Sequence, residues 1–192
     1  MRIIGGTAAG KILKAPKGLN VRPTPDLVRQ AIFNSLGALV EDARVLELFG
    51  GTGALSIESL SRGAKTATCV ELSGKHARFI QNNVKTCGLS SGTFNICIED
   101  VFHALPRMAK NGQQFDLIMA DPPFGEKNVN KRSESLSQKL LDDEHLPSLL
   151  APDGIFVLGH TRRDTLEITD AWEQRKHMKH GNSCMRFLVT SN

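Results

Sequence analysis

Residues 45–53 have the sequence Val-Leu-Glu-Leu-Phe-Gly-Gly-Thr-Gly, and this stretch decides the fold. Its apolar start predicts a short buried strand that ends near Phe49. Glycines at the end of a strand let the backbone approach a ligand closely, and the amides at the start of the next helix then face that ligand. A strand, a glycine turn and a helix in this order form the repeating element of an α/β sheet.

Apolar runs and helical patterns alternate from residue 44 onward. We expect strands at residues 45–49, 66–71, 94–98, 115–120, 155–158, 172–178 and 184–190. We expect one helix that ends at residue 60, and others at residues 73–87, 101–109 and 137 to about 150. The last two strands are expected to form a hairpin around Gly181 and Asn182. This alternation predicts an α/β fold with a doubly wound, mostly parallel, seven-stranded sheet.

The first forty residues depart from this pattern. Two short runs within residues 2–14 are separated by a glycine-rich stretch, which predicts a β-hairpin. After a proline-punctuated linker, Thr24 is expected to cap a helix that has Pro25 at its first position. The residues expected on the buried face of this helix are Leu27, Val28, Ala31, Ile32 and Leu36. We therefore expect one domain over residues 1–192, with residues 1–40 as a hairpin and helix extension.

Positive charge is concentrated at the amino-terminal end. The 192 residues have a net charge of +4, but residues 1–30 alone carry six basic side chains and one acidic side chain. Arg2, Lys11 and Lys14 belong to the expected hairpin, and Arg22 lies in the linker. A basic arm on a nearly neutral body indicates a polyanionic partner. The alternative is a solvated surface with a chance excess of charge.

Composition argues against a membrane protein. Hydrophobic residues make up 40% of the chain, and no apolar run approaches the roughly 20 residues of a membrane span. The first residues lack the long apolar region of a secretory signal, so we expect a cytoplasmic protein. The four cysteines are scattered, which suits small buried side chains in a reducing compartment.

One segment near the carboxyl end contains three residues of types that bind metals. His177, His180 and Cys184 are close together in the sequence. A structural zinc ion requires four ligands, and this segment offers three. We therefore expect a basic, solvated tail and no metal site.

Residues 119–125 have the sequence Met-Ala-Asp-Pro-Pro-Phe-Gly and follow an apolar run. Two prolines cannot continue a central strand, because neither donates a hydrogen bond to the ladder. The strand must therefore end here and present Asp121 and Phe124 at its carboxyl end, where open α/β sheets bind ligands. A carboxylate, rigidly held carbonyl groups and an aromatic ring suit a planar substrate that carries an amino group.

The chemistry of such a substrate assigns roles to these residues. The exocyclic amine of a nucleobase is a poor nucleophile, because its lone pair is delocalised into the ring. Hydrogen bonds to Asp121 and to the Pro122 carbonyl favour a tetrahedral nitrogen, and Asp121 can accept the proton that is lost. Phe124 would stack on a base turned out of its helix. The structural alternative is a pair of prolines that only terminates a strand.

Acidic residues lie within or shortly after three of the expected strands. Glu47 suits a ligand with an amino group and a positive centre, and is a poor neighbour for a pyrophosphate. Glu71, 24 residues later, can accept hydrogen bonds from both hydroxyls of a ribose. Asp100 suits an adenine amino group with Val101 against the ring, and a helix cap is an equally good interpretation of Asp100. Together these residues predict a nucleoside cofactor.

The residues now described resemble a known family. Asp121 to Phe124 matches the (Asp/Asn/Ser)-Pro-Pro-aromatic signature of amino-group methyltransferases that use S-adenosylmethionine. More narrowly, the chain resembles the RsmD-type methyltransferases, which modify guanine N2 in small-subunit ribosomal RNA. The blocks that carry this resemblance are Met1 to Gly6 with Gly10 and Lys11; Arg22 to Thr24 with Val28, Arg29, Phe33 and Asn34; Leu48 and Phe49 with Gly51 to Leu55, Glu58 and Leu60 to Ala64; Phe115 to Ile118; and His180 to Asn182.

The resemblance implies a Rossmann-like class I methyltransferase fold, S-adenosylmethionine as cofactor, and 16S ribosomal RNA in the assembling 30S subunit as partner. We expect a monomer. The expected catalytic residues are Asp121, Pro122 and Phe124. The residues expected beside the cofactor are Glu47, Phe49, Gly51, Gly53, Glu71, Leu72, Asp100 and Val101. The residues expected to contact RNA are Arg2, Lys11, Lys14, Arg22, Pro123 and Phe124.

Four features depart from the family pattern. Glu47 replaces the commoner Asp, Gly50 replaces a usual Ala, the tail lacks the aromatic residue often seen before Gly181, and Gly159 stands where many relatives carry a polar or acidic residue. None of these changes removes an expected catalytic group.

Three alternative functions stay open. An adenine-N6 methyltransferase acting on DNA would usually need a target-recognition insertion, for which this chain has no segment of sufficient length. A nicotinamide-dependent dehydrogenase explains the glycine turn and leaves the Asp121 motif unused. A non-catalytic RNA-binding assembly factor would use the basic arm and would not bind S-adenosylmethionine.

Overall fold

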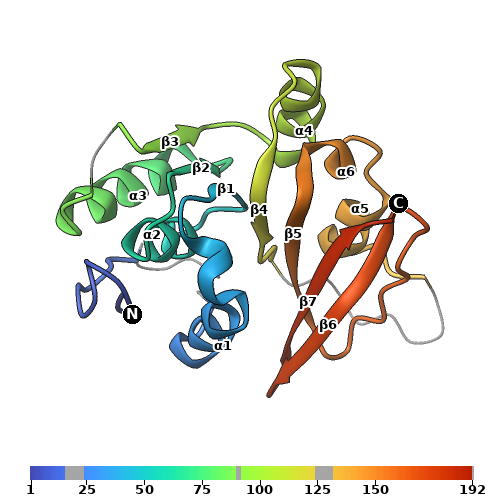
Figure 1. The fold of residues 1–192 in the computed structure, drawn as a ribbon, viewed down its shortest axis with the longest axis horizontal. Helices are drawn as coiled ribbons and strands as arrows, with labels where there is room; N and C mark the ends of the chain where they lie inside the picture. Colours follow the sequence, from blue (N-terminus) through green and yellow to red (C-terminus); the bar gives the residue numbers. More distant parts are fainter. Residues whose placement is uncertain (16–23, 90–91, 124–131, 192) are drawn as a thin grey trace. The chain divides into compact units, whose positions relative to one another are not determined.

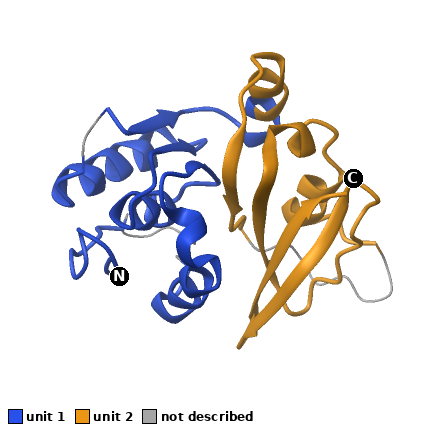
Figure 2. Ribbon diagram, viewed as in Figure 1, with its two compact units in different colours: residues 1–104 blue, residues 105–192 orange. Residues whose placement is uncertain are grey.

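The computed structural model describes residues 1–15, 24–89, 92–123 and 132–191. They form two compact units, residues 1–104 and residues 105–192 (Figure 2). The chain passes from one unit to the other within α4 (Val101–Lys110) (Figure 1). The single domain expected over residues 1–192, with its extension at residues 1–40, stays a prediction.

The first unit is built on three parallel strands in the order β3-β2-β1. Its elements are α1 (Asp26–Leu36), η1 (Gly37–Val40), β1 (Arg44–Leu48), α2 (Ala54–Ser61), β2 (Thr66–Val70), α3 (Gly74–Thr86) and β3 (Phe94–Cys97). Val45, Leu46 and Leu48 are fully buried, as expected for a parallel strand covered on both faces. Because the strands are parallel, their carboxyl ends meet at one edge, which brings Phe49, Glu71 and Ile98 to neighbouring positions.

The predicted amino-terminal hairpin is present in a short form. Arg2 and Ile12 make one antiparallel bridge, and the Ile3 and Leu13 amides bond to the Lys11 and Met1 carbonyls. Ile3, Ala8 and Leu13 are buried in a core cluster with Ile57, Val84 and Cys87, which come from α2 and from the end of α3. The arm is therefore part of the core of the first unit.

The first helix differs from its prediction in two respects. It begins at Asp26 with Pro25 at the N-cap, so Thr24 is not the cap, and the N-cap makes no side-chain hydrogen bond. Leu27, expected on the buried face, is 75% exposed, whereas Arg29, which was not among the residues expected there, is fully buried. Arg29 can be buried because its guanidinium donates to the Thr24 and Arg2 carbonyls and to the Asp26 carboxylate.

The helices after β1 and β2 follow their predicted boundaries closely. The hydroxyl of Ser73 accepts a hydrogen bond from the His76 amide, as an N-cap does, and Ala77, Ile80 and Val84 lie on the buried face of α3. Gly88 follows this helix with a φ of 71°, the left-handed conformation that glycine adopts at helix ends.

The second unit contains four strands in the order β4-β5-β7-β6. Its elements after α4 are β4 (Phe115–Ala120), α5 (Leu136–Asp142), α6 (Leu146–Leu149), β5 (Leu150–Thr161), β6 (Trp172–His180) and β7 (Ser183–Thr190). β4 and β5 are parallel, and β6 and β7 form the predicted hairpin around Gly181 and Asn182. Phe156 packs against Trp172 with ring centroids 5.2 Å apart.

The prediction of a single helix from residue 137 to about 150 is wrong, because two short helices, α5 and α6, occupy this range. α5 ends at Asp142, and Asp143 adopts an extended conformation. The Asp143 carboxylate then accepts hydrogen bonds from the His145 and Leu146 amides, which starts α6 as a separate turn. Among the described helices, none is both long enough and apolar enough to cross a membrane.

Candidate functional site

The turn after β1 has an unusual backbone. Phe49, Gly51 and Gly53 have φ values of 59°, 56° and 72°. Glycine adopts this conformation freely, but a bulky residue such as Phe49 adopts it rarely, and such strain concentrates at functional sites. Phe49 packs edge-on against Phe102, with centroids 6.4 Å apart. The turn is therefore held in an open, left-handed shape at the carboxyl edge of the strands.

Glu47 lies beneath this turn and is 3% exposed. Its carboxylate accepts hydrogen bonds from the Leu55 amide at 3.3 Å and the Ser56 amide at 2.9 Å, at the start of α2. Burial raises the pKa of Glu47 to about 7, and the two amides act against that rise. Glu47 thus organises the helix start as an N-terminal carboxylate does, and its predicted contact with a ligand amine stays a prediction.

Glu71 connects the end of β2 to the glycine turn. One carboxylate oxygen accepts a hydrogen bond from the Gly51 amide at 2.8 Å, and the other accepts one from the Ser73 amide at 2.9 Å. His76 Nδ1 lies 3.2 Å from the second oxygen. His76 was not predicted from the sequence, although its position in the first turn of a helix capped by Ser73 is the available signal. The carboxylate is therefore fixed in place at the strand edge.

Two apolar side chains stand exposed beside Glu71. Leu72 is 68% exposed and Ile98 is 55% exposed. Gly74 lies next to Ile98, since a Cβ at residue 74 would be 4.0 Å from Ile98 Cγ2. Leu72 was predicted to contact the cofactor and Ile98 was not, although Ile98 directly follows β3, as Glu71 directly follows β2. Exposed apolar groups at a strand edge suit a flat, partly apolar ligand.

Asp100 caps α4, which confirms the helix-cap interpretation of this residue. Its carboxylate accepts a hydrogen bond from the Phe102 amide at 2.8 Å. Asp100 is partly exposed, and Val101 is 3% exposed and therefore buried. The same partly exposed carboxylate has acceptor capacity beyond one amide.

The Asp121 motif follows β4 in the second unit. Asp121 is partly exposed, Pro122 is buried and Pro123 is exposed. A Cβ added to Gly159, on the neighbouring strand β5, would lie 2.4 Å from Asp121 Oδ1. Gly159 therefore leaves the space that the Asp121 carboxylate occupies, which gives a physical reason for glycine at this position. Phe124 lies outside the described residues.

The basic arm is tied to α2 by buried polar groups that sequence reasoning missed. Glu58 is fully buried and accepts hydrogen bonds from the Ile4 amide at 2.8 Å and the Gly5 amide at 2.9 Å. Ser61 accepts from the Ala8 amide and donates to the Gly5 carbonyl.

The arm also bonds to α3. Asn83 bonds to both the amide and the carbonyl of Lys14. The arm backbone is thus fixed, and the side chains of Arg2, Lys11 and Lys14 are exposed. Arg22, also predicted to contact RNA, lies outside the described residues.

The chain matches known proteins over nearly its whole length. Residues 1–189 match the family model described as Conserved hypothetical protein 95, the RsmD family. The chain belongs to this family.

Proteins similar to this RsmD-type chain include named methyltransferases. The chain is 35% identical to YlbH of Bacillus subtilis (strain 168), which is named as a candidate rRNA methyltransferase, over 88% of the chain and 87% of that protein. It is 36% identical to Ribosomal RNA small subunit methyltransferase D of Escherichia coli (strain K12), over 65% of the chain and 60% of that protein. A solved structure of a candidate methyltransferase from Escherichia coli superimposes with a TM-score of 0.78 and 28% identity, covering 100% of the chain and 98% of that structure.

These matches confirm the predicted fold class. The RsmD-type chain has the α/β, Rossmann-like class I methyltransferase fold, with seven strands among the residues that the structure describes. The structure also explains why Gly50 replaces the alanine that is usual in the family. A Cβ at Gly50 would lie 2.3 Å from Cys69 Sγ, so the thiol occupies the space that an alanine methyl would need.

Proposed function

We propose that this protein transfers a methyl group from S-adenosylmethionine to the exocyclic N2 amine of one guanine in 16S ribosomal RNA. The reaction takes place in the cytoplasm on the assembling small ribosomal subunit, and the protein acts as a monomer. Membership of the RsmD family over residues 1–189 is the observation that carries this proposal. The comparison with Ribosomal RNA small subunit methyltransferase D of Escherichia coli supports the choice of RNA.

The first unit has residues that fit the cofactor. Gly51 and Gly53 have left-handed φ values, and a Cβ at Gly53 would lie 2.7 Å from Cγ2 of the buried Ile80, so the packing of this turn requires glycine there. In the proposal, Glu71 accepts hydrogen bonds from the ribose, Leu72 and Ile98 pack on the adenine, and Glu47 attracts the amino group. When bound, S-adenosylmethionine supplies a methyl group activated by a positively charged sulfur.

The second unit has residues that fit the target amine. Asp121 and the Pro122 carbonyl accept hydrogen bonds from the amine, which restores a lone pair to the nitrogen. Asp121 then accepts the proton that the amine loses as the new carbon–nitrogen bond forms. Phe124 is proposed to stack on the guanine, and the preceding residue, Pro123, is exposed. Positioning of the amine provides most of the acceleration.

The arm fits a phosphate backbone. Arg2, Lys11 and Lys14 are exposed on a backbone that Glu58, Ser61 and Asn83 hold in one conformation. Ile12, between two of these cations, is 71% exposed. A fixed array of cations with one apolar contact suits recognition of folded RNA through its shape and phosphates.

The decisive experiment compares ribosomal RNA from cells with and without the gene. Digestion of 16S ribosomal RNA to oligonucleotides and mass analysis should locate one N2-methylguanosine that is present only when the protein is present. Purified protein with S-adenosylmethionine should restore that nucleoside to RNA from the deletion strain. N6-methyladenosine as the product would instead establish the adenine-N6 alternative.

The non-catalytic alternative makes a different prediction about the cofactor. An assembly factor that only binds RNA has no use for the residues around Glu71 and should produce no heat with S-adenosylmethionine in calorimetry. The proposal requires saturable binding of that cofactor and loss of binding in Glu71→Ala.

A further inference from the structure

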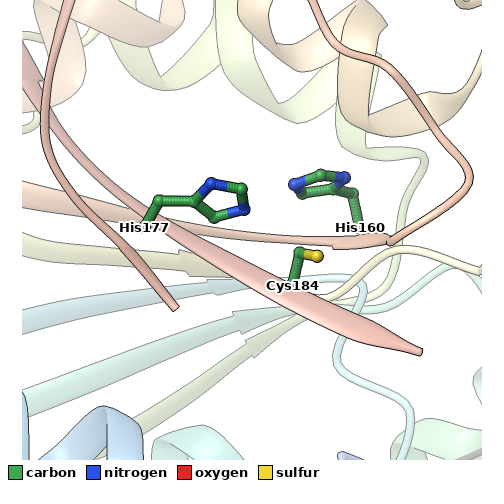
Figure 3. Close-up of side chains that lie close together, drawn as sticks. All are labelled: His160, His177 and Cys184. Carbon is green, nitrogen blue, oxygen red and sulfur yellow. The ribbon is translucent and has the colours of Figure 1, made fainter. Parts of the chain in front are cut away.

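Three adjacent strands of the second unit bring two histidines and a cysteine together. His160 lies on β5, His177 on β6 and Cys184 on β7, and Figure 3 shows the two rings beside the thiol. One nitrogen from each ring and the sulfur all lie within 4.8 Å of one another. The two imidazole rings are stacked with centroids 5.8 Å apart.

The strand register accounts for this grouping. His160 pairs directly with Cys184, and His177 pairs with Arg186, two residues further along β7. Residues paired across strands share a face, and so do residues two apart on one strand. His180, the histidine that the sequence placed with Cys184, is instead paired with Ser183 and is exposed.

The nitrogen atoms of the cluster have lone pairs suited to binding a ligand. His160 Nδ1 lies 2.9 Å from the Thr161 carbonyl and 3.1 Å from the Asp164 carbonyl. Carbonyl oxygens only accept hydrogen bonds, so Nδ1 carries the proton and Nε2 presents a lone pair. Metal-binding histidines are oriented in this way by a backbone carbonyl. His177 Nε2 is buried and has no hydrogen-bond partner among the described residues.

We propose that His160, His177 and Cys184 form a binding site for a divalent transition-metal ion of the zinc class. Two imidazole nitrogens and one thiolate are donors that zinc prefers, and zinc sites with three protein ligands keep a fourth position for water. His177 is partly exposed, which gives the ion and that water a route to the site. Tetrahedral zinc brings nitrogen and sulfur ligands to about 3.5 Å from one another.

Arg186 is the competitor for this site. Its Nε lies 3.1 Å from His160 Nε2 and donates to the same lone pair that an ion would use. Nη1 of Arg186 also donates to the Gln174 side chain, which can retain the guanidinium when the ion displaces it from His160. Lys179 and Arg162 add positive charge near the thiol, so the site has weaker affinity than an uncharged site with the same ligands.

Cobalt(II) is the probe that tests the ligand set. Titration of the purified, reduced protein with Co²⁺ should produce the sulfur-to-cobalt charge-transfer absorption and intense d–d bands of a tetrahedral site. Zn²⁺ should then abolish both signals at one equivalent. His177→Gln and Cys184→Ser should each lower affinity by about 100-fold or more, because both supply an ion ligand.

Matched controls separate this site from adventitious binding. His180→Gln changes the nearest histidine on the same strand, and Cys97→Ser removes a partly exposed thiol in the first unit. Both variants should bind Co²⁺ and Zn²⁺ as the parent does. Arg186→Gln should bind Zn²⁺ about tenfold more tightly, because it removes the competing cation.

Defined results would overturn the proposal. A cobalt spectrum without the thiolate band, or equal Zn²⁺ affinity in His177→Gln and the parent, would show that these residues are a packed polar cluster. Because His177 is partly exposed, its variant should fold, and circular dichroism would verify this. The proposal does not depend on methyl transfer, so its failure would leave the proposed function unaffected.

Discussion

Glu47 and Glu71 in the first unit, and His160 and His177 in the second, are polar side chains that the fold treats differently. Each glutamate accepts hydrogen bonds from two backbone amides of its own unit. The His177 ring instead has a buried nitrogen with no partner in the described part of the chain, beside the thiol of Cys184. The glutamates are therefore fixed in geometry before any ligand arrives. The buried Nε2 atom of His177 makes no hydrogen bond to the described residues. A buried polar atom of this kind lowers the stability of the folded protein until a partner binds to it.

The largest expected effect comes from a substitution in the second unit that should nearly abolish catalysis and leave cofactor binding by the first unit intact. Asp121→Ala should lower turnover by about 1,000-fold, because the amine loses both its orienting acceptor and its base. S-adenosylmethionine affinity, measured by calorimetry, should stay within about twofold, since every residue proposed to bind the cofactor lies in the first unit. Asp170→Ala, a change at an exposed aspartate of the second unit, is the control and should retain turnover. Full activity in Asp121→Ala would eliminate its proposed catalytic role.

The second test measures how much burial of the Glu47 carboxylate lowers the free energy of unfolding. Its pKa is about 7 in the folded protein against 4.5 ordinarily, so the folded state binds the extra proton between these values. Stability should therefore fall as pH rises from about 4.5 to 7, by about 3 kcal/mol in total. Glu47→Gln removes this titration. Urea unfolding at pH 5 and pH 8 should show a smaller pH-dependent loss in the variant than in the parent.

Glu144→Gln is the matched control for that experiment. The Glu144 side chain is 86% exposed, so its removal should leave the difference between pH 5 and pH 8 unchanged. Identical pH dependence in Glu47→Gln and the parent would mean that the carboxylate is not as desolvated as its burial indicates.

A third test concerns the space beside Asp121. Gly159→Ala places a methyl group where Asp121 Oδ1 now lies, so the carboxylate must move. Turnover should fall on the order of tenfold while cofactor affinity is retained, because a displaced base is misaligned with its proton. In an Asp121→Ala background, the same Gly159→Ala change should cost less stability than in the parent. Equal costs in both backgrounds would show that the methyl group does not press on the carboxylate.

The smallest expected effect concerns the arm. Changing Arg2, Lys11 and Lys14 to Gln together should weaken binding to a 16S ribosomal RNA transcript by about tenfold at low salt. The slope of log affinity against log salt should become shallower by about 0.7 to 0.9 for each phosphate that the arm no longer neutralises. The control replaces Lys110, Lys139 and Arg163, three exposed cations outside the arm, with Gln. The same slope in the arm variant and the parent would exclude binding of phosphates by the arm.

Much of the fold could be predicted because it follows from local patterns. The apolar run at Val45 and the Ser73 cap determine a strand and a helix with little help from distant residues. Leu27 was wrongly expected on the buried face, and Arg29 was not expected there, because helical periodicity was applied to apolar residue types alone. The Arg2 carbonyl, 27 residues away in sequence, provides the partner that makes burial of Arg29 possible. Periodicity contains no information about such a partner.

In the candidate site, too, residues marked by local sequence could be predicted and residues that depend on distant partners could not. Glu71 and Asp121 could be identified because both sit immediately after an apolar strand. Glu58, which anchors the arm, lies in the middle of a buried helix, and its role depends on amides more than fifty residues away. The cysteine–histidine cluster depends on strand register, which placed His160 rather than His180 opposite Cys184. Spacing along one hairpin could not reveal a ligand from a third strand.

The attachment of the arm to Glu58 and Ser61 has a consequence for synthesis of the chain. Residues 1–14 are translated before the groups that hold them, which lie 53 and 54 residues later. A two-stranded hairpin on its own is only marginally stable in water. The part of the first unit that is made earliest is therefore ordered only after α2 has been translated and folded. A nascent chain that has not completed α2 has its basic residues but lacks the ordered array that they form in the finished protein.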